Sequence, residues 1–457
     1  MRERAARLWR GLDKRALAVA LVAAGVRLFW IAVVHAEPVS DFAFYFSRAG
    51  DLAAGKGYLL AGHPTAYWPP GYPFFLAAFF RLFGSSLVVV RLLNVAMWTA
   101  SAVLMCLFGK RLGGPSAGLV AGLVVALYPE YVFFTGLVAS EGLFVLQMSV
   151  VALLLAVDPR SRRQRLAIAA AAGLLLGWGV ITRPASVLLP LTLCVAVWLL
   201  RRREQGFTTA LVIGICALLA MAPWVIRNRV VMGEWVIATN GGTSVWGGAH
   251  EGSTGTFLRP DEPMPWMRRM TTTRDELHNN AEGGKAAVAF MREHPWAWLS
   301  LAPTKLSGLF AEPTGIDWNF VRYDPTTFRT TVRSLGRFEN LVIRLAKSYR
   351  HVPGSMRWFQ ALEWILGTLG LILALAARRK AAAWPLTIIV YWVFFQITLS
   401  TGQPRYLVST GPLLAPGLGF LWVVVATRLR RGSAGPLAGD GTAPSGRLAS
   451  AARREVG

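Results

Sequence analysis

The sequence predicts an all-α polytopic membrane protein, a bundle of about ten transmembrane helices, and three observations lead to that fold class. Of the 457 residues, 54% are hydrophobic and only 16% are charged. Apolar runs of roughly 18 or more residues recur along the chain, the length that a helix needs to cross about 30 Å of hydrocarbon. The runs are continuous rather than alternating, so they lack the pattern of a transmembrane β-barrel.

Ten spans are expected, with basic clusters between them. The spans lie near residues 16–36, 86–109, 116–134, 138–157, 165–182, 184–200, 206–226, 357–376, 382–400 and 407–428. Arginine and lysine gather at residues 2–15, 110–111, 160–165, 201–203, 378–380 and 428–431. Such clusters mark cytoplasmic loops. A cytoplasmic N-terminus places all of them in the cytoplasm by parity, together with the C-terminus, so we expect a multi-pass protein of the plasma (inner) membrane.

The remaining chain forms two outer regions and a tail. We divide it into an N-terminal membrane module at 1–226 with a first outer loop at about 37–85, a second outer region at 227–356, C-terminal membrane helices at 357–431, and a disordered cytoplasmic tail at 432–457. The stretch at 296–310 is too short to span and holds Lys305 near its middle, so we expect an interfacial or re-entrant helix. If it did span, the downstream topology would be reversed. Residues 34–36 loosely resemble a signal cleavage site, but the long apolar run before them favours an uncleaved anchor.

Several function classes are not supported by the composition. The net charge of +24 would suggest nucleic-acid binding in a soluble protein. Here the cations flank apolar runs, the arrangement that anchors loops to an anionic leaflet, so no nucleic-acid partner is expected. The three cysteines lie in apolar runs without paired spacing. No P-loop, H-E-x-x-H or G-x-S-x-G motif is present, and no metal or other cofactor is expected, although a divalent metal stays an open alternative.

The segment after the first span carries a candidate catalytic carboxylate. Ser40 is a plausible N-cap, and Asp41 follows it in the first helical turn, where a carboxylate suits the helix dipole. Asp41, Tyr45 and Arg48 fall on one helix face. A carboxylate at the membrane boundary, beside a phenol and a cation, can act as a general base toward a hydroxyl group. A helix cap with a surface ion pair explains the pattern equally well.

Aromatic residues and further acids follow in the outer turns. The Pro- and Gly-rich loop at 62–73 is stiff, and its Tyr67 and Tyr72 could stack against a sugar ring, although an ordinary aromatic belt is the favoured interpretation. Glu130 and Glu141 lie near the starts of helices, and each is either a helix-start residue, which we favour, or a cavity-lining acid. Arg183 either lines a polar cavity or is a snorkelling anchor, the commoner case.

Three cations are expected at the outer membrane face. Arg227, Lys305 and Arg405 together could hold a lipid phosphate, to which arginine can bind in a bidentate manner. Individually, each is more often a headgroup anchor. The acidic pairs at 261–262 and 275–276 have the composition of a solvated surface.

Further motifs accompany these residues in a fixed order. After Asp41 and Tyr45 come Gly55-x-Gly57, Pro64-Thr65, Pro69-Pro70-Gly71-Tyr72-Pro73, Arg91-x-x-Asn94, Ser140-Glu141, Pro223-Trp224-x-x-Arg227-Asn228, Asn240-Gly241-Gly242, His294-Pro295 and Pro404-Arg405-Tyr406. From about Leu17 to Ala426, this order resembles bacterial GT-C glycosyltransferases. More narrowly, it resembles the branch related to protein O-mannosyltransferases and lipid A aminoarabinose transferases.

The resemblance implies an enzyme that moves a sugar from a polyprenyl-phosphate donor to an extracytoplasmic glycan, lipid or protein, with inversion. Asp41 matches the first-loop aspartate that acts as general base in the family. The candidate substrate-binding residues are Tyr45, Arg48, Tyr67, Tyr72, Glu141, Arg227, Lys305 and Arg405. Two departures limit the detail: Phe42 follows Asp41 where many relatives have a second acid, and Trp68 stands where the aminoarabinose enzymes have lysine. Aminoarabinose is therefore not assigned as the sugar.

Two other classes stay open. A membrane transporter or lipid flippase would usually show inverted repeats and polar or broken helices near the middle of the membrane. Here the ionisable residues gather mostly at the outer boundary, which suits chemistry on a lipid headgroup. A catalytically silent scaffold of the cell envelope is the third class. Substitution of Asp41 would not affect such a scaffold.

Overall fold

The structure is a computed structural model, and it describes residues 13–34, 37–38, 40–201, 203–255, 264, 266–310 and 353–433. All structural statements here concern these residues. The expected disordered tail, apart from its first two residues, and the acidic pair at 261–262 lie outside them.

The described chain is almost wholly helical, which confirms the expected all-α membrane fold. Seven of its helices are long and apolar enough to cross a membrane, and two of the three shorter apolar segments contain α7 and α9. The long ones are α2 (Lys14–Val33), α5 (Leu87–Leu127), α8 (Arg162–Thr182), α10 (Arg203–Met232), α18 (Pro353–Ala376), α19 (Ala383–Leu399) and α21 (Ala415–Ser433), and the shorter ones are α7 (Glu141–Leu155) and α9 (Leu189–Leu200).

Helix α5 corresponds to two of the expected spans. Its backbone leaves the helical region at Gly113 and Gly114, and Gly114 has a φ of 81°, which favours glycine. Pro115 follows this break at a point where its missing N–H costs no helical hydrogen bond. Two glycines and a proline, just after the basic pair at 110–111, therefore divide α5 into two helical segments.

Close packing holds the spanning helices together. Helices α2 and α21 both pack along α5, and α8 packs along α10. On α8, Gly173 and Gly177 lie so close to α10 that a Cβ at either position would clash with an α10 carbonyl. On α2, the fully buried Arg27 donates to the carbonyls of Val125 and Ala126 at 2.8 Å each. Carbonyls at the C-terminal end of α5 thus accept from both terminal nitrogens of this buried guanidinium group.

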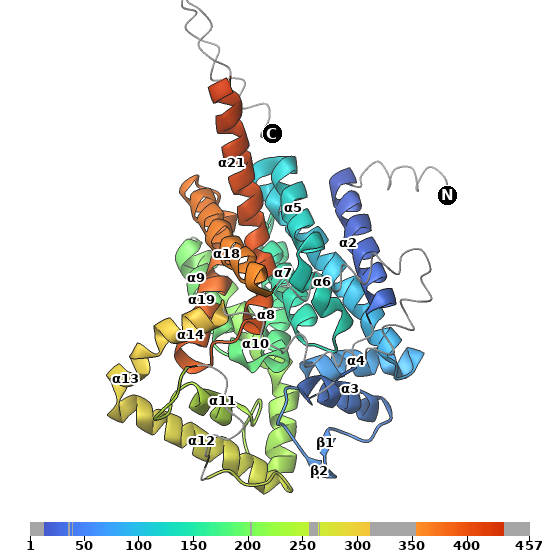
Figure 1. Ribbon diagram of the computed structural model, residues 1–457, viewed down its shortest axis with the longest axis vertical. Coiled ribbons are helices and arrows are strands. Elements are labelled where there is room, and N and C mark those ends of the chain that lie inside the picture. Colours follow the sequence, from blue (N-terminus) through green and yellow to red (C-terminus); the bar gives the residue numbers. More distant parts are fainter. Residues whose placement is uncertain are drawn as a thin grey trace, which may run out of the picture.

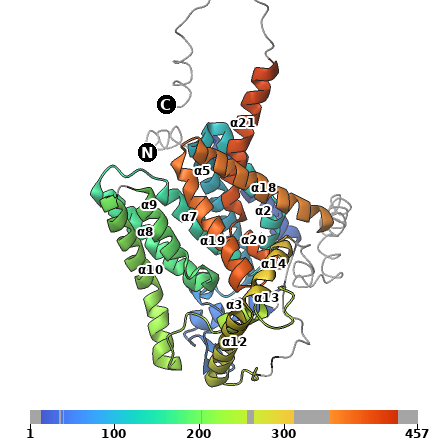
Figure 2. The same ribbon diagram turned by 90° about the vertical axis from the view of Figure 1, so that its left-hand side faces the viewer.

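The short elements gather at one end of the bundle, away from the start of α2 and the end of α21 (Figures 1 and 2). From the first outer loop come α3 (Ser40–Ala53), the antiparallel pair β1 (Leu59–Leu60) and β2 (His63–Pro64), and α4 (Gly71–Phe83). From the second outer region come α11 (Gly241–Gly247), α12 (Thr273–Glu293), α13 (Pro295–Ser300) and α14 (Ala302–Leu309). The expected interfacial stretch at 296–310 thus forms two short helices, neither of spanning length.

The remaining turns connect the spanning helices. Between α5 and α7 lie α6 (Pro129–Phe133) and η1 (Phe134–Gly136), and η2 (Pro184–Ser186) precedes α9. Helix α18 leads through η4 (Lys380–Ala382) into α19. Between α19 and α21 lie α20 (Arg405–Val408) and η5 (Gly411–Leu414).

Candidate active site

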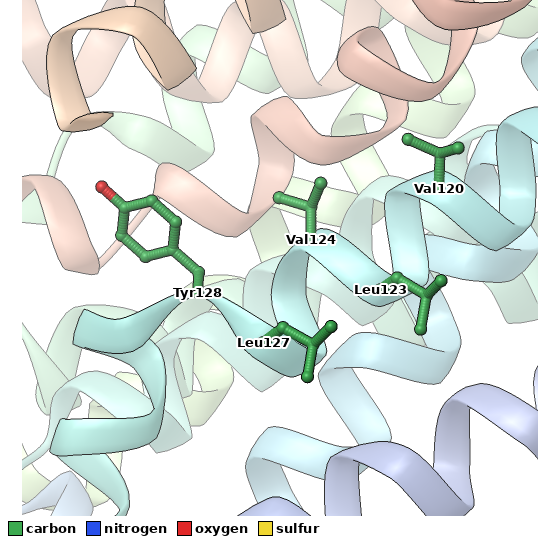
Figure 3. Close-up of a pocket in the computed structure, with 5 residues that line it drawn as sticks. All are labelled: Val120, Leu123, Val124, Leu127 and Tyr128. Carbon is green, nitrogen blue, oxygen red and sulfur yellow. The ribbon is translucent and has the colours of Figure 1, made fainter. Parts of the chain in front are cut away.

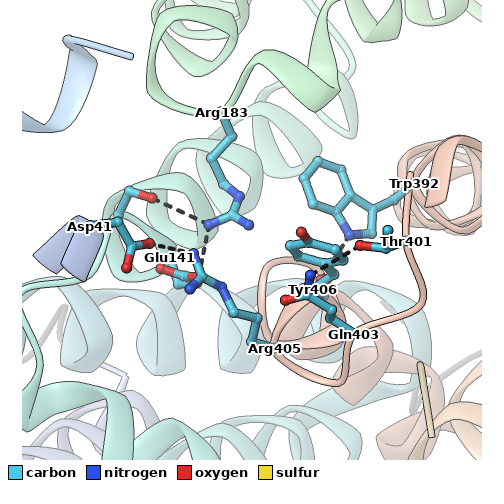
Figure 4. Close-up of polar contacts among 9 residues, drawn as sticks. Asp41, Glu141, Arg183, Trp392, Thr401, Gln403, Arg405 and Tyr406 are labelled. Carbon is cyan, nitrogen blue, oxygen red and sulfur yellow. Dashed lines mark hydrogen bonds and ion pairs between the residues drawn. The ribbon is translucent and has the colours of Figure 1, made fainter. Parts of the chain in front are cut away.

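The Asp41 carboxylate forms an ion pair with a residue from the other end of the chain. Asp41 lies in the first turn of α3 and is 3% exposed. Arg405, the first residue of α20, donates from Nη2 to Asp41 Oδ2 at 2.7 Å (Figure 4). The contact joins residues 364 positions apart. It therefore ties the first outer loop to the connection between α19 and α20.

Glu141 extends this pair into a cluster of four charged residues. It is the first residue of α7 and is fully buried. Arg183, at the end of α8, places Nη1 at 2.9 Å from Glu141 Oε1 and also donates to Ser140 Oγ at 3.2 Å. Arg405 Nε lies 3.5 Å from the same Glu141 oxygen (Figure 4). We call Asp41, Glu141, Arg183 and Arg405 the acid–arginine cluster, and its two acids balance its two cations.

Electrostatics keep the bridging guanidinium charged. Burial by itself lowers the pKa of Arg405, but the carboxylates of Asp41 and Glu141 outweigh this effect and raise the pKa above its usual value. Arg405 therefore stays a cation at any physiological pH. Buried ions of this kind are costly unless they are paired, because each has left water. The four charges are mutually compensated in the resting structure.

Aromatic side chains pack beside Asp41. Tyr45, one helical turn after it, makes edge contacts with Trp68 and Tyr72 at ring-centroid distances of 6.3 and 5.8 Å. Burial raises the pKa of the Tyr45 phenol, and the Asp41 carboxylate raises it further, so the phenol stays neutral. The hydroxyl of Tyr72 is buried without a hydrogen-bond partner in the described part of the chain. It is a free polar group beside the cluster.

The other predicted site residues lie elsewhere. Arg48 forms an ion pair with Asp51 at 2.8 Å rather than with Asp41. Arg227 donates to the carbonyls of Tyr58 and Thr65, both at 2.9 Å, and so holds the first outer loop. Tyr67 makes an edge contact with Trp68 at 5.1 Å.

Lys305 is fully buried, and its Nζ donates to the Thr398 carbonyl at 3.1 Å. Of the three cations expected to hold a phosphate, only Arg405 contacts Asp41 in the structure.

Sequence reasoning underrated Arg183 and was wrong about Glu276. The sequence favours a membrane anchor for Arg183, and no local pattern links it to Glu141. Glu276 was expected on a solvated surface, but it is fully buried because three donors face it from two outer segments. It accepts from Thr65 Oγ1 at 2.6 Å, from the Ala66 N–H at 2.8 Å and from Thr239 Oγ1. The neighbouring Asp275 closes a capping box with Thr272, as an exposed helix start would.

Two other features help to delimit the site. An apolar pocket along α5 is lined by Val120, Leu123, Val124, Leu127 and Tyr128, none of which belongs to the acid–arginine cluster (Figure 3). Among the described residues, no group of three or more His, Cys, Asp or Glu side chains could hold a metal ion. In the part of the chain that the structure describes, the acid–arginine cluster is therefore the best candidate for a site that needs both a base and a cation.

Comparisons with known proteins concern the family and the fold. Residues 67–226 match the family model described as dolichyl-phosphate-mannose-protein mannosyltransferase. A search among curated proteins finds no match. The matched segment contains Glu141 and Arg183 of the cluster, but not Asp41 or Arg405.

Among solved structures, the chain is similar to the archaeal oligosaccharyltransferase AglB from Archaeoglobus fulgidus in complex with an inhibitory peptide and a dolichol-phosphate. The identity is 13% and the TM-score 0.51, over 96% of this chain and 54% of that chain. The Archaeoglobus fulgidus oligosaccharyltransferase with Zn and sulfate gives 12% identity and a TM-score of 0.52, over 91% and 50%. ArnT from Cupriavidus metallidurans bound to undecaprenyl phosphate gives 16% identity and a TM-score of 0.41, over 88% and 77%.

The chain thus spans about half the length of the oligosaccharyltransferases it matches. At these identities, the similarity shows a shared fold. Together with the family match, it confirms the resemblance to GT-C glycosyltransferases that the sequence motifs indicate.

Proposed function

We propose that this chain is a GT-C-type membrane glycosyltransferase that moves a sugar from a polyprenyl-phosphate donor to an extracytoplasmic acceptor with inversion. The family match over residues 67–226 and the shared fold support the proposal. The observation that carries the proposal is the contact of 2.7 Å between Asp41 and Arg405. It joins a carboxylate that can accept a proton to a cation that can bind a phosphate. These are the two groups that transfer from a lipid phosphate requires.

Asp41 is the general base in this reaction. Its carboxylate takes the proton from the acceptor hydroxyl as the hydroxyl oxygen forms a bond to the anomeric carbon of the sugar. The bond from that carbon to the phosphate oxygen breaks, and its electron pair leaves with the polyprenyl phosphate. Attack from the face opposite the leaving group inverts the anomeric carbon. Phosphate is a good leaving group, so no second acid is needed.

Arg405 stabilises the charge that grows on the departing phosphate. In the resting cluster it is held by Asp41 and, at 3.5 Å, by Glu141. The donor phosphodiester carries one negative charge, competes with Asp41 for the same guanidinium, and gains a second negative charge as its bond to the sugar breaks. Binding of the donor then loosens Arg405 from Asp41 and leaves the carboxylate able to accept a proton. Arg183 keeps Glu141 compensated at 2.9 Å while Arg405 turns to the phosphate.

The remaining candidate residues support this arrangement in different ways. Tyr45 and Tyr72 lie beside the cluster and offer ring faces and a free hydroxyl to the sugar. Tyr67 extends this aromatic wall through Trp68. Arg227 holds the first outer loop through the contacts described above, whereas Arg48 pairs with Asp51 within α3.

The same proposal assigns a side of the membrane. The site lies at the end of the bundle that carries the short outer elements, opposite the start of α2 and the end of α21 (Figure 1). Basic residues at the expected cytoplasmic turns favour an extracytoplasmic site with both termini in the cytoplasm. The acceptor is then a component of the cell envelope, and membrane lipid supplies the donor's anchor.

Mass spectrometry of envelope glycans and polyprenyl-phosphate sugars tests the proposal. A strain without the gene is complemented with wild type, with Asp41→Asn, or with the matched control Asp51→Asn on the same helix. We expect loss of one sugar from an envelope polymer, restored by wild type and Asp51→Asn but not by Asp41→Asn. An unchanged glycan profile in the deletion strain, or full rescue by Asp41→Asn, would falsify the proposal.

A further inference from the structure

The position of Arg405 depends on a connection that has little structure of its own. Helix α20 has only four residues, and the preceding segment 400–404 links it to α19. On the membrane side, Trp392 of α19 donates from Nε1 to the Tyr406 carbonyl at 2.8 Å (Figure 4). This contact fixes the residue after Arg405 but not the segment before it. The segment 400–404 therefore needs support from elsewhere.

That support comes from the second outer region, through backbone contacts at glycines. The Gly402 N–H donates to the Gly255 carbonyl at 2.9 Å. A Cβ on Gly248 would clash with the Ser400 carbonyl, and a Cβ on Gly308 would lie 2.8 Å from the Gly402 carbonyl. We call Gly248, Gly255, Gly308 and Gly402 the glycine junction. Its members bring three chain segments into direct backbone contact.

Of the four glycines in the junction, Gly402 has the least room for a side chain. A Cβ there would clash with the Lys305 backbone, and a backbone atom cannot rotate aside as a flexible side chain can. Lys305 Nζ and Trp298 Nε1 both donate to the Thr398 carbonyl, at 3.1 and 3.0 Å, just before the same segment. Any side chain at position 402 thus pushes the connection away from α14.

We propose that Gly402 is a positioning residue, which lets the second outer region seat directly on the segment 400–404 and so aims Arg405 at Asp41. The inference rests on the proposed role of Arg405 and adds a link between the outer region and the donor-phosphate cation. Displacement of a reacting group by about 1 Å can cost roughly 100-fold in rate. A single methyl group at position 402 is therefore sufficient to disturb catalysis while every residue of the acid–arginine cluster is kept.

The test compares Gly402→Ala with Gly417→Ala. Gly417 on α21 is equally crowded, because a Cβ there would clash with the Gly367 carbonyl of α18, but it contacts no part of the glycine junction. Both purified variants are assayed for kcat and for KM of the polyprenyl-phosphate sugar, and hydrogen exchange is followed for peptides covering residues 398–409. We expect Gly402→Ala to lower kcat by roughly 10- to 100-fold and to speed exchange in those peptides, with Gly417→Ala near wild type in both.

A milder variant guards against misfolding. Trp298→Phe keeps an aromatic ring in a smaller side chain and removes the hydrogen bond to the Thr398 carbonyl, and we expect a smaller loss of kcat with faster exchange in the same peptides. Equal kcat and equal exchange for Gly402→Ala and Gly417→Ala would overturn the inference. If wild type transfers no sugar, the proposed function fails, whereas the exchange data still decide whether Gly402 positions the connection.

Discussion

Two buried polar clusters in this molecule each contain two carboxylates, but the groups that pair with these carboxylates differ between the clusters. In the acid–arginine cluster, Asp41 and Glu141 contact guanidinium groups at 2.7 and 2.9 Å. The second cluster, which we call the acid–tyrosine cluster, consists of Glu130, Tyr131, Gln360 and Glu363. There the Tyr131 hydroxyl donates to Glu363 Oε1 at 2.8 Å, and Gln360 Nε2 donates to Glu130 Oε2 at 3.2 Å.

The different partners indicate different roles: one cluster holds full charges, and the other links two helices by hydrogen bonds. Hydroxyl and amide donors tie α6 to α18 and can serve a neutral acid as well as a charged one. Arginine–carboxylate pairs are costly to bury, and we infer that this molecule keeps one here because the full charge has a function. The acid–arginine cluster is therefore the one we assign to chemistry, and the acid–tyrosine cluster is a hydrogen-bonded brace between helices. The predictions below test this distinction.

Removal of the bridging cation has the largest expected effect. Arg405→Gln leaves Asp41 without its partner and deprives the donor phosphate of its cation. We expect transfer to fall by roughly 100-fold or more, because preorganised charge at the leaving group is lost. The stability cost of an uncompensated buried carboxylate is about 3–5 kcal/mol. The measurements are kcat/KM for the donor and thermal unfolding in detergent, and normal donor kinetics would contradict the role of Arg405.

The same substitution made in both clusters compares them directly. Glu141→Gln leaves Arg183 with a neutral partner, so we expect an activity loss of roughly 10-fold and a lower unfolding temperature. Glu363→Gln keeps size and hydrogen bonding to Tyr131, so we expect activity within about 2-fold of wild type and a stability change near 1 kcal/mol. Parallel assays of both variants suffice. Equal losses of activity would erase the distinction between the clusters.

The sequence predicted the fold well because membrane insertion leaves a local signature. Each span is a predominantly apolar run, and even the break in α5 is visible as Gly113-Gly114-Pro115. Asp41 could also be singled out, since a carboxylate in a first helical turn at the membrane boundary is a local pattern. These features depend on neighbours within a few residues.

The partners within the site could not be predicted, because they are set by tertiary contacts. Nothing near Arg405 in the sequence indicates that it meets Asp41, and Arg183 has the appearance of an ordinary anchor. Glu276 follows Asp275 in the first turn of α12, yet Glu276 is buried whereas Asp275 caps the helix. Which of two adjacent acids is buried depends on Thr65 and Thr239 in other segments, and a single sequence does not show that arrangement.

Glu276 provides a third kind of compensation, by neutral donors around one buried acid. Glu276→Gln replaces an acceptor-only carboxylate by an amide, which sets an NH₂ group against donors from Thr65, Ala66 or Thr239. We expect a loss of about 1–3 kcal/mol in stability, with a smaller drop in activity than for Glu141→Gln. Thermal unfolding and limited proteolysis of the first outer loop measure it. The control is Glu282→Gln on the same helix, whose partner is the exposed Lys285 at 2.7 Å.

Lys305 extends the comparison to a buried cation and carries the smallest expected effect. Burial lowers its pKa to about 8, from an ordinary value of 10.5. Between these two pH values the unfolded chain binds a proton that the folded chain does not, so stability rises with pH in this window. Lys305→Met lacks this pH-dependent contribution to stability. The unfolding temperature of wild type, measured relative to that of Lys305→Met, should therefore increase as the pH rises from about 8 toward 10.5. If the unfolding temperatures of the two proteins changed with pH in the same way, Lys305 would keep its proton in the folded state. That result would mean that an anionic group compensates the buried ammonium group, as Asp41 compensates Arg405.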